Sequence, residues 1–259
     1  MRFFEEEMDH LLIERGKTEA ALRRAIDEDV IEVRFKPTFD LRSGEVAAFE
    51  AFPYWEDEHV EVSAERFLTI AEETGLVHAM FAQVLRKACV AAGKWPTATR
   101  LSIDVLPGQL TDQELGASIL GIAQDCGFSL DRLEIEIAES LLVRDLPGAQ
   151  RALAPLREAG VKMTLDHFGT GYSSLYHIQE FKLDKVKIDR RFTENLADER
   201  SAKVMRALAG LGQGLGLIVT ADGVEGSSSP LLPSGIEHAQ PTAGLITTAE
   251  AAALFGERE

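Results

Sequence analysis

The sequence predicts an α/β protein folded as a (β/α)8 barrel. From residue 29 onward, short β-branched runs alternate with amphipathic helical stretches, and eight of these runs have strand character. The length of 259 residues also suits a single barrel domain. No G-x-G-x-x-G pattern follows the first predicted strand, so an open dinucleotide-binding sheet is disfavoured.

Each predicted strand is a short apolar run enriched in β-branched residues. The eight strands are expected at residues 31–35, 46–52, 100–105, 133–137, 161–165, 185–188, 217–221 and 236–240.

The predicted helices lie in the segments between these strands. Ser63 is expected to cap a helix over residues 64–73, and Thr111 followed by Glu114 has the spacing of a capping box. Further helices are expected at residues 76–92, 193–212 and 248–255.

The first part of the chain differs from the rest. Residues 5–28 are rich in charge and present few apolar positions, among them Leu22 and Ile26. Such a helix is a poor globular element but a suitable linker. We therefore expect an N-terminal linker helix over residues 1–28 and a barrel domain over residues 29–259.

Charge excludes several classes of partner. The chain has 27 Lys+Arg and 43 Asp+Glu, which gives a net charge of −16 at pH 7. Nucleic acids and anionic membranes both require an excess of basic residues, so neither is an expected partner. A small phosphorylated ligand remains compatible with this charge, because metal ions can supply the missing positive charge.

The sequence also predicts a cytoplasmic location. No stretch approaches the roughly 18 apolar residues of a membrane-spanning helix, and the acidic N-terminus does not resemble a signal peptide. Cys89 and Cys126 fit no metal or redox spacing, so we expect reduced thiols.

Ionisable and hydrogen-bonding residues recur where the predicted strands end. In barrels of this class, chemistry takes place at the C-terminal ends of the strands. Each residue alone is better explained as a solvated loop residue, but five converging carboxylates would repel unless cations bind or some protonate. Oxygen-rich clusters suit Mg²⁺, Mn²⁺ or Ca²⁺, so the set predicts metal-dependent phosphoester hydrolysis. Its members are Glu50, Asp104, Glu136, Asp166, His167, Lys187, Asp222 and Gln240.

A series of motifs in order resembles the EAL domain family, the cyclic di-GMP phosphodiesterases. The segment DHFGTGYSSL at 166–175 differs in one residue from the family's DDFGTGYSSL, and Glu50-Ala-Phe stands where the family has Glu-Ala-Leu. The other matching segments are DLRSGE at 40–45, SAERFLTIAEETG at 63–75, LSID at 101–104, LEIEIAES at 133–140, VKIDR at 186–190 and ADGVE at 221–225.

The resemblance implies a two-metal mechanism that opens cyclic di-GMP to linear pGpG, with Glu50 and Lys187 as catalytic residues. Lys187 would hold the attacking water, and Glu139 would brace the loop that contains Gly169 and Gly171. The first metal would be bound by Glu50, Asp104, Glu136 and Asp166, and the second by Asp166, His167 and Asp222.

Several positions depart from the family pattern. Asp104 replaces Asn, His167 replaces Asp, and Asp222 replaces Glu and is one methylene shorter. Of the expected substrate-binding residues, Gln240 matches the family, while three differ. The segment 226–235 is also shorter than the family's helix and contains two prolines. The three differing substrate-binding residues are Lys36 in place of Gln, Phe52 in place of Leu, and Tyr54 in place of a phosphate-binding Arg.

These departures predict a degenerate EAL domain that is catalytically impaired. One divalent ion, Mg²⁺ or Mn²⁺, is expected at one site rather than two. The domain would act as a regulatory, ligand-sensing or protein-interaction module, and an active phosphodiesterase is the alternative. The segment 2–9 resembles the linker between GGDEF and EAL domains, which implies an adjacent signalling domain. The resemblance to the EAL family implies cyclic di-GMP, a partner protein and a second copy of the chain as the other expected partners.

Overall fold

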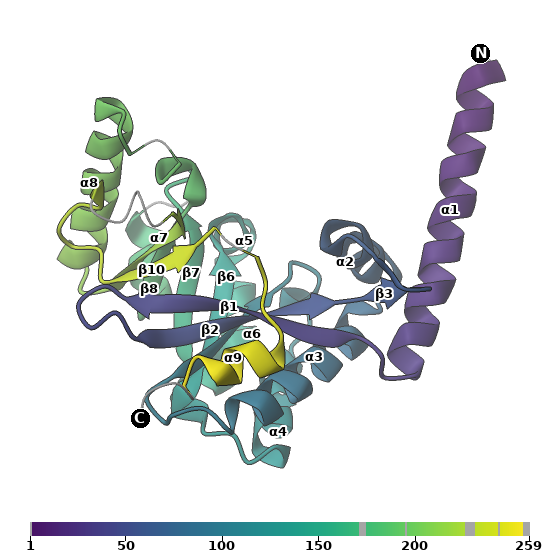
Figure 1. The fold of residues 1–259 in the computed structure, drawn as a ribbon, viewed down its shortest axis with the longest axis horizontal. Coiled ribbons are helices and arrows are strands. Elements are labelled where there is room, and N and C mark those ends of the chain that lie inside the picture. The colour runs from purple at the N-terminus through teal and green to yellow at the C-terminus, as the bar shows by residue number, and fades with distance from the viewer. Residues whose placement is uncertain (1, 171–174, 195, 226–230, 243, 256–259) are drawn as a thin grey trace.

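A closed eight-stranded barrel is the centre of the molecule. The computed structural model describes residues 2–170, 175–194, 196–225, 231–242 and 244–255, and Figure 1 shows the strands surrounded by helices. The (β/α)8-type barrel expected from the sequence is therefore confirmed. Its strands are β1 (Glu32–Asp40), β2 (Val46–Tyr54), β5 (Arg100–Val105), β6 (Leu133–Ala138), β7 (Lys162–Phe168), β8 (Lys185–Ile188), β9 (Ile218–Val224) and β10 (His238–Pro241).

One strand runs against the others. β1 is antiparallel to both of its neighbours, β2 and β10, and the remaining neighbours are parallel. A tight turn joins β1 to β2, which forces an antiparallel pair because a parallel pair needs a long crossover. The Asp40 carboxylate builds this turn by accepting hydrogen bonds from the backbone N–H groups of Arg42 (2.8 Å) and Ser43 (2.7 Å).

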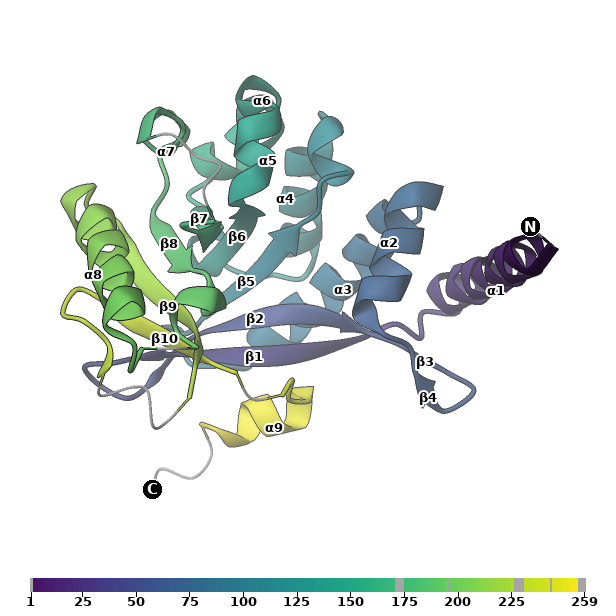
Figure 2. The same ribbon diagram turned by 90° about the horizontal axis from the view of Figure 1, so that it is seen from above.

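The helices cover the outside of the barrel, as Figure 2 shows from above. A short hairpin of β3 (Glu56–Asp57) and β4 (Val60–Glu61) follows β2. The helices are α2 (Ala64–Thr74), α3 (Val77–Ala92), α4 (Leu115–Asp125), α5 (Glu139–Arg144), α6 (Leu146–Glu158), α7 (Leu175–Phe181), α8 (Glu199–Gly214) and α9 (Thr248–Ala253), with 3-10 turns η1 (Gln109–Thr111), η2 (Leu130–Arg132) and η3 (Arg190–Phe192).

Two of the sequence-based helix starts were wrong. Thr111 does not cap a helix, because its hydroxyl donates to the carbonyl of Gly108 (2.8 Å) within η1, and α4 begins only at Leu115. The helix expected from residue 193 begins at Glu199, where the Asp198 carboxylate accepts the backbone N–H of Ser201 (2.9 Å). Ser63 does stand at the N-cap of α2, but its side chain makes no capping hydrogen bond.

Side-chain alternation separates the two faces of the barrel wall. In β6, Leu133, Ile135 and Ile137 are fully buried in the apolar core, while Glu134 and Glu136 lie on the opposite face of the strand. The inside of the barrel is therefore polar. Alternation along the strands thus directs the functional side chains inward.

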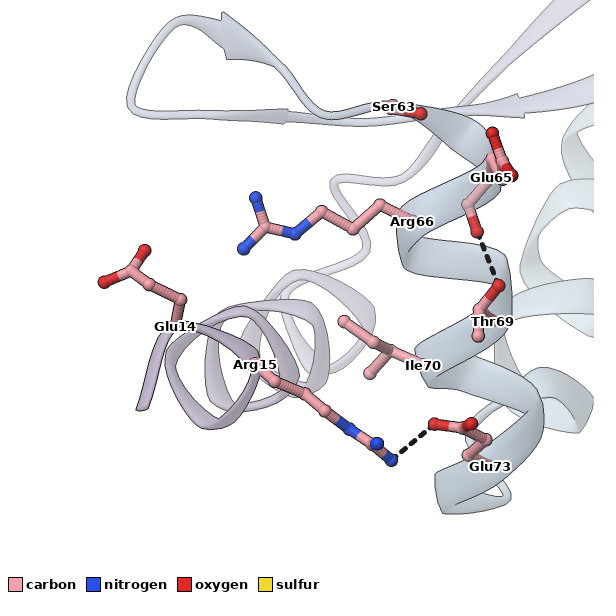
Figure 3. A pocket seen from close by; sticks show the side chains of 8 residues that line it. All are labelled: Glu14, Arg15, Ser63, Glu65, Arg66, Thr69, Ile70 and Glu73. Carbon is pink, nitrogen blue, oxygen red and sulfur yellow. Dashed lines mark hydrogen bonds and ion pairs between the residues drawn. The ribbon is translucent and has the colours of Figure 1, made fainter. Parts of the chain in front are cut away.

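The first helix, α1 (Arg2–Asp27), extends away from the barrel beside α2 (Figure 1). Its C-terminal part is anchored by Leu22, which is fully buried, and Arg66 of α2 donates to the Thr18 hydroxyl (2.6 Å). A groove of about 630 Å³ lies between the two helices, where Arg15 forms an ion pair with Glu73 (Figure 3). None of the residues that line this groove belongs to the site expected from the sequence. Among the described residues, no helix combines the length and apolarity needed to cross a membrane.

Candidate functional site

Three buried or half-buried carboxylates meet at one end of the barrel. Glu50 of β2, Asp104 of β5 and Glu136 of β6 each present an oxygen, and these oxygens all lie within 4.8 Å of one another. The strand register explains the meeting, because Asp104 and Glu136 are direct neighbours across β5 and β6. Oxygen donors at this spacing fit a divalent cation such as Mg²⁺ or Mn²⁺.

The electrostatics of the cluster indicate unbalanced negative charge. Burial, and next the nearby Glu136 carboxylate, raise the pKa of Glu50 to about 7. Burial and the Glu50 charge also raise the pKa of Asp104 well above its ordinary value. The pKa of Glu136 is lowered instead, because the attraction of Lys187 and Lys185 outweighs the effect of burial. A bound cation would remove this conflict by favouring all three ionised forms.

Lys187 of β8 is the central cation of the site. Its ammonium donates to Glu136 and to Glu50 Oε2 (3.0 Å) and lies 3.4 Å from Asp166 Oδ1. Although burial lowers the pKa of Lys187, the surrounding carboxylates, Asp166 first, raise it well above the ordinary value. Lys187 is therefore a fixed positive charge and not a base at neutral pH. The side-chain amide of Gln240 in β10 also contacts the cluster and donates to Glu50 Oε2 (2.6 Å).

Asp166 stands at the boundary between the cluster and the following loop. It is buried, and burial raises its pKa despite the attraction of Lys187. Beyond it, Glu139 Oε2 accepts the backbone N–H groups of Gly169 (3.1 Å) and Thr170 (3.0 Å). Gly169 has φ +95°, and a Cβ added to it would lie 2.7 Å from Leu208 Cδ1, so any other residue would strain the backbone and displace Leu208. Gly171 lies outside the described residues.

His167 is held by a second buried carboxylate that the sequence did not single out. Its Nδ1 lies 2.8 Å from Asp189 Oδ2, and its Nε2 lies 3.4 Å from Asp166 Oδ2. The pKa of Asp189 is lowered, because hydrogen bonds from Arg191 outweigh the effect of burial. The Asp189 carboxylate therefore fixes the orientation of the imidazole through Nδ1, and this orientation places Nε2 beside Asp166.

Asp222, the other ligand that the resemblance implied for a second metal, is already paired. The Lys36 ammonium of β1 donates to Asp222 Oδ1 (2.9 Å), and both side chains are largely shielded from water, at 17% and 15% exposed. With an ammonium on the shortened Asp222 and a nitrogen at His167, the residues present do not fit a second Mg²⁺ or Mn²⁺. They do fit one cation at Glu50, Asp104 and Glu136.

The two remaining positions expected to bind substrate lie further along β2. Phe52 borders a small apolar cavity of about 120 Å³ together with Asp104 and Phe81. The Tyr54 hydroxyl donates a hydrogen bond to Glu56 (2.5 Å), and the Arg34 guanidinium of β1 lies over the Tyr54 ring, 4.1 Å from its centroid. Arg34 was missed by the sequence analysis. Its spacing of two residues from Lys36 was the available signal, since such residues share a strand face.

Several known proteins are similar to this chain. A protein of Sinorhizobium fredii, y4lL, is 35% identical over 261 residues, which cover 98% of this chain and 32% of that protein. The cyclic di-GMP phosphodiesterase NbdA of Pseudomonas aeruginosa is 30% identical over 230 residues, which cover 86% of this chain and 29% of that protein. The solved PaMucR phosphodiesterase, a complex with c-di-GMP, superimposes with a TM-score of 0.84 at 26% identity, over 91% of this chain and 99% of that chain.

A match to a family model identifies the family of this chain. The chain spans about a third of the length of the curated relatives it matches, so it corresponds to one part of those longer proteins. The model of the EAL domain matches residues 19–229, which is most of the chain and contains nearly every residue of the site. The chain belongs to the EAL domain family.

Proposed function

We propose that this EAL domain acts in cyclic di-GMP signalling as a catalytically impaired regulatory module that binds cyclic di-GMP. The observation that carries the proposal is the hydrogen bond between Lys36 and Asp222 at 2.9 Å. It ties up a carboxylate that a second divalent cation would need. The membership in the EAL family and the c-di-GMP bound to the PaMucR phosphodiesterase support the choice of ligand.

One cation site is consistent with the remaining donors. Glu50, Asp104 and Glu136 would hold one Mg²⁺ or Mn²⁺, and a cation there would polarise a phosphoryl oxygen. Lys187 would contribute a fixed positive charge toward the phosphodiester. Gln240 would keep the Glu50 carboxylate turned toward the cluster through its 2.6 Å hydrogen bond.

Impairment follows from what an in-line displacement requires. The attacking and the leaving oxygen both need stabilisation, and a pair of metal ions clamps both at once. Here the Lys36 ammonium pairs with Asp222, one of the carboxylates that the second cation would need. An ammonium attracts an anion, but it does not lower the pKa of a bound water as a metal ion does. Ligand binding is thereby favoured over hydrolysis.

An active phosphodiesterase is the second candidate. The three-carboxylate cluster and the charged Lys187 favour it, because one cation can still activate a water beside a bound ligand. A third candidate is a module that only contacts proteins. It is favoured because the chain matches about a third of the length of its relatives, in which the matching region is joined to further sequence.

One set of measurements separates these functions. Purified protein is incubated with cyclic di-GMP and Mg²⁺ or Mn²⁺, the linear product is quantified by chromatography, and binding is measured by calorimetry with Ca²⁺ or EDTA. We expect micromolar binding and turnover far below about 1 s⁻¹, the lower end for typical enzymes. Turnover at or above that rate would establish the phosphodiesterase. Absence of binding up to millimolar ligand would leave the protein-contact module.

A further inference from the structure

The inner face of β1 carries two positive charges that point to the same side of the sheet. In the β1–β2 register, Lys36 pairs with Glu50 and Arg34 pairs with Phe52. Alternation therefore places Arg34 and Lys36 on the face that also carries Glu50 and Tyr54, with the two cations about 7 Å apart along the strand. β1 and β2 form the long two-stranded ribbon in the middle of Figure 1.

Lys36 is held in position by its neighbours and is largely buried. Its side chain is 17% exposed, and its partner Asp222 is held in turn, since the Thr193 hydroxyl donates to the Asp222 carbonyl (2.6 Å). The Lys36–Asp222 pair is neutral overall. One N–H of the ammonium donates to Asp222 Oδ1, and an ammonium has three, so Lys36 can also donate to a phosphate oxygen at short range. Lys36 thus brings a cationic charge to the second-metal side of the mouth.

Arg34 is preorganised by an aromatic ring. Its guanidinium lies 4.1 Å from the Tyr54 ring centroid, and it also forms an ion pair with Glu32 at 2.9 Å. Stacking fixes the plane of the guanidinium while leaving N–H groups at its edge for an anion. The Glu32 side chain is 58% exposed, and such an exposed ion pair holds weakly, so an incoming phosphate can displace it.

We propose that Arg34 and Lys36 form a phosphodiester-binding strip that operates without a second divalent cation. The proposal rests on the proposed binding of cyclic di-GMP, and it assigns the roles within that site. Lys36 supplies the positive charge beside Asp222, and Arg34 supplies the guanidinium at the position of Tyr54. A ligand with two phosphodiester groups can engage both cations along the strand.

Arg34 matters for the binding of an anionic ligand because the side chains around it are mostly acidic. Arg34 and Tyr54 border a groove of about 350 Å³ whose other charged side chains include Glu32, Glu56 and Glu58. Without Arg34, these acids would repel a phosphate. A charge-assisted hydrogen bond lost at such a place corresponds to a loss of affinity of about tenfold or more.

Calorimetry with cyclic di-GMP in the presence of EDTA tests the strip. We expect the wild-type protein to bind without added metal and the variant Arg34→Gln to bind at least about tenfold more weakly. The matched control is Arg42→Gln, which removes the same charge from the exposed turn after β1 and should bind like the wild type. Thermal unfolding of both variants verifies folding. Affinity of Arg34→Gln within twofold of the wild type overturns the proposal, as does binding that requires metal.

A ligand-free measurement tests Lys36 separately. The stoichiometry of Mn²⁺ is determined by equilibrium dialysis for the wild type and for Lys36→Gln, whose amide removes the ammonium from Asp222. We expect one Mn²⁺ per wild-type chain and a second, weaker Mn²⁺ in the variant. Two ions of similar affinity in the wild type overturn the role of Lys36. These outcomes differ from a failure of the proposed function, which appears as turnover by the wild type or as absence of any binding.

Discussion

The two sides of the barrel mouth satisfy their negative charge in different ways. On the side of β2, β5 and β6, three carboxylates crowd together, and the pKa of Glu50 rises to about 7 because burial and a neighbouring acid disfavour ionisation. On the side of β9 and β1, Asp222 has the Lys36 ammonium at 2.9 Å. The first side still needs a cation from solution, and the second contains its own. The Lys36 ammonium therefore balances the charge of Asp222, whereas the three-carboxylate side keeps unbalanced negative charge.

Removing one acid from each side is the most direct test of whether the two sides bind metal differently. Glu136→Gln deletes a charged ligand from the cluster and should weaken Mn²⁺ binding by about 100-fold, the upper range for changes around metal sites. Asp222→Asn is the matched variant on the other side and should leave the tight Mn²⁺ site within about twofold of the wild type. Calorimetry with Mn²⁺ measures both. Equal losses in the two variants would show that the sides are one site.

Restoring the family residues on the second side should have the next largest effect. The triple variant Lys36→Gln, His167→Asp and Asp222→Glu removes the ammonium from residue 222, replaces a nitrogen donor by a carboxylate, and lengthens the carboxylate side chain at residue 222. We expect a second Mn²⁺ per chain and turnover of cyclic di-GMP raised by about 10- to 100-fold. Chromatography of the linear product measures the turnover. If Mn²⁺ stoichiometry rises and turnover does not, the proposal that the second side limits turnover is wrong.

The two sides also differ in how well the sequence could predict them. Residues at strand ends, such as Asp104 and Glu136, could be placed in one cluster because the carboxyl ends of neighbouring barrel strands meet. The partners of Asp222 and His167 could not be placed. Lys36 lies 186 residues from Asp222, and the choice of Asp189 for His167 depends on the backbone of His167, which has φ +56°. No local pattern encodes such contacts.

The fold shows a similar division. Short apolar runs enriched in β-branched residues located all eight strands, because the strands of a barrel wall are buried on both faces. The short helix α5 (Glu139–Arg144) was not expected, because one and a half turns carry too little periodicity to detect. Its first residue is the Glu139 that holds the loop after Asp166.

The pH dependence of metal binding offers a smaller effect on the first side alone. Glu50 has a pKa of about 7 in the cation-free protein, above its ordinary 4.5, so below pH 7 a cation must displace a proton. Mn²⁺ affinity should therefore rise about tenfold from pH 6 to pH 8, with release of one proton. Calorimetry in buffers of different ionisation enthalpy measures both quantities. A flat profile would show that Glu50 is already ionised.

The same shift predicts how stability changes with pH when no metal is present. Between pH 4.5 and about 7, the unfolded chain releases the Glu50 proton while the folded protein keeps it. In EDTA, the free energy of unfolding contributed by this group therefore falls as the pH rises through that window. Glu50→Gln should flatten the slope, as followed by urea unfolding at several pH values. An unchanged slope in the variant would assign the effect to another group.

Loss of the ion pair between α1 and α2 should have the smallest effect, so this variant serves as a reference for the other variants. Arg15 contacts Glu73 across the groove in Figure 3, and their side chains are 49% and 47% exposed. Water screens such a pair, so Arg15→Ala should lower the free energy of unfolding by less than about 1 kcal/mol in urea. It should leave Mn²⁺ affinity unchanged, since Arg15 belongs to a groove that contains none of the site residues. A change in Mn²⁺ affinity would instead mean that the position of α1 is coupled to the barrel mouth.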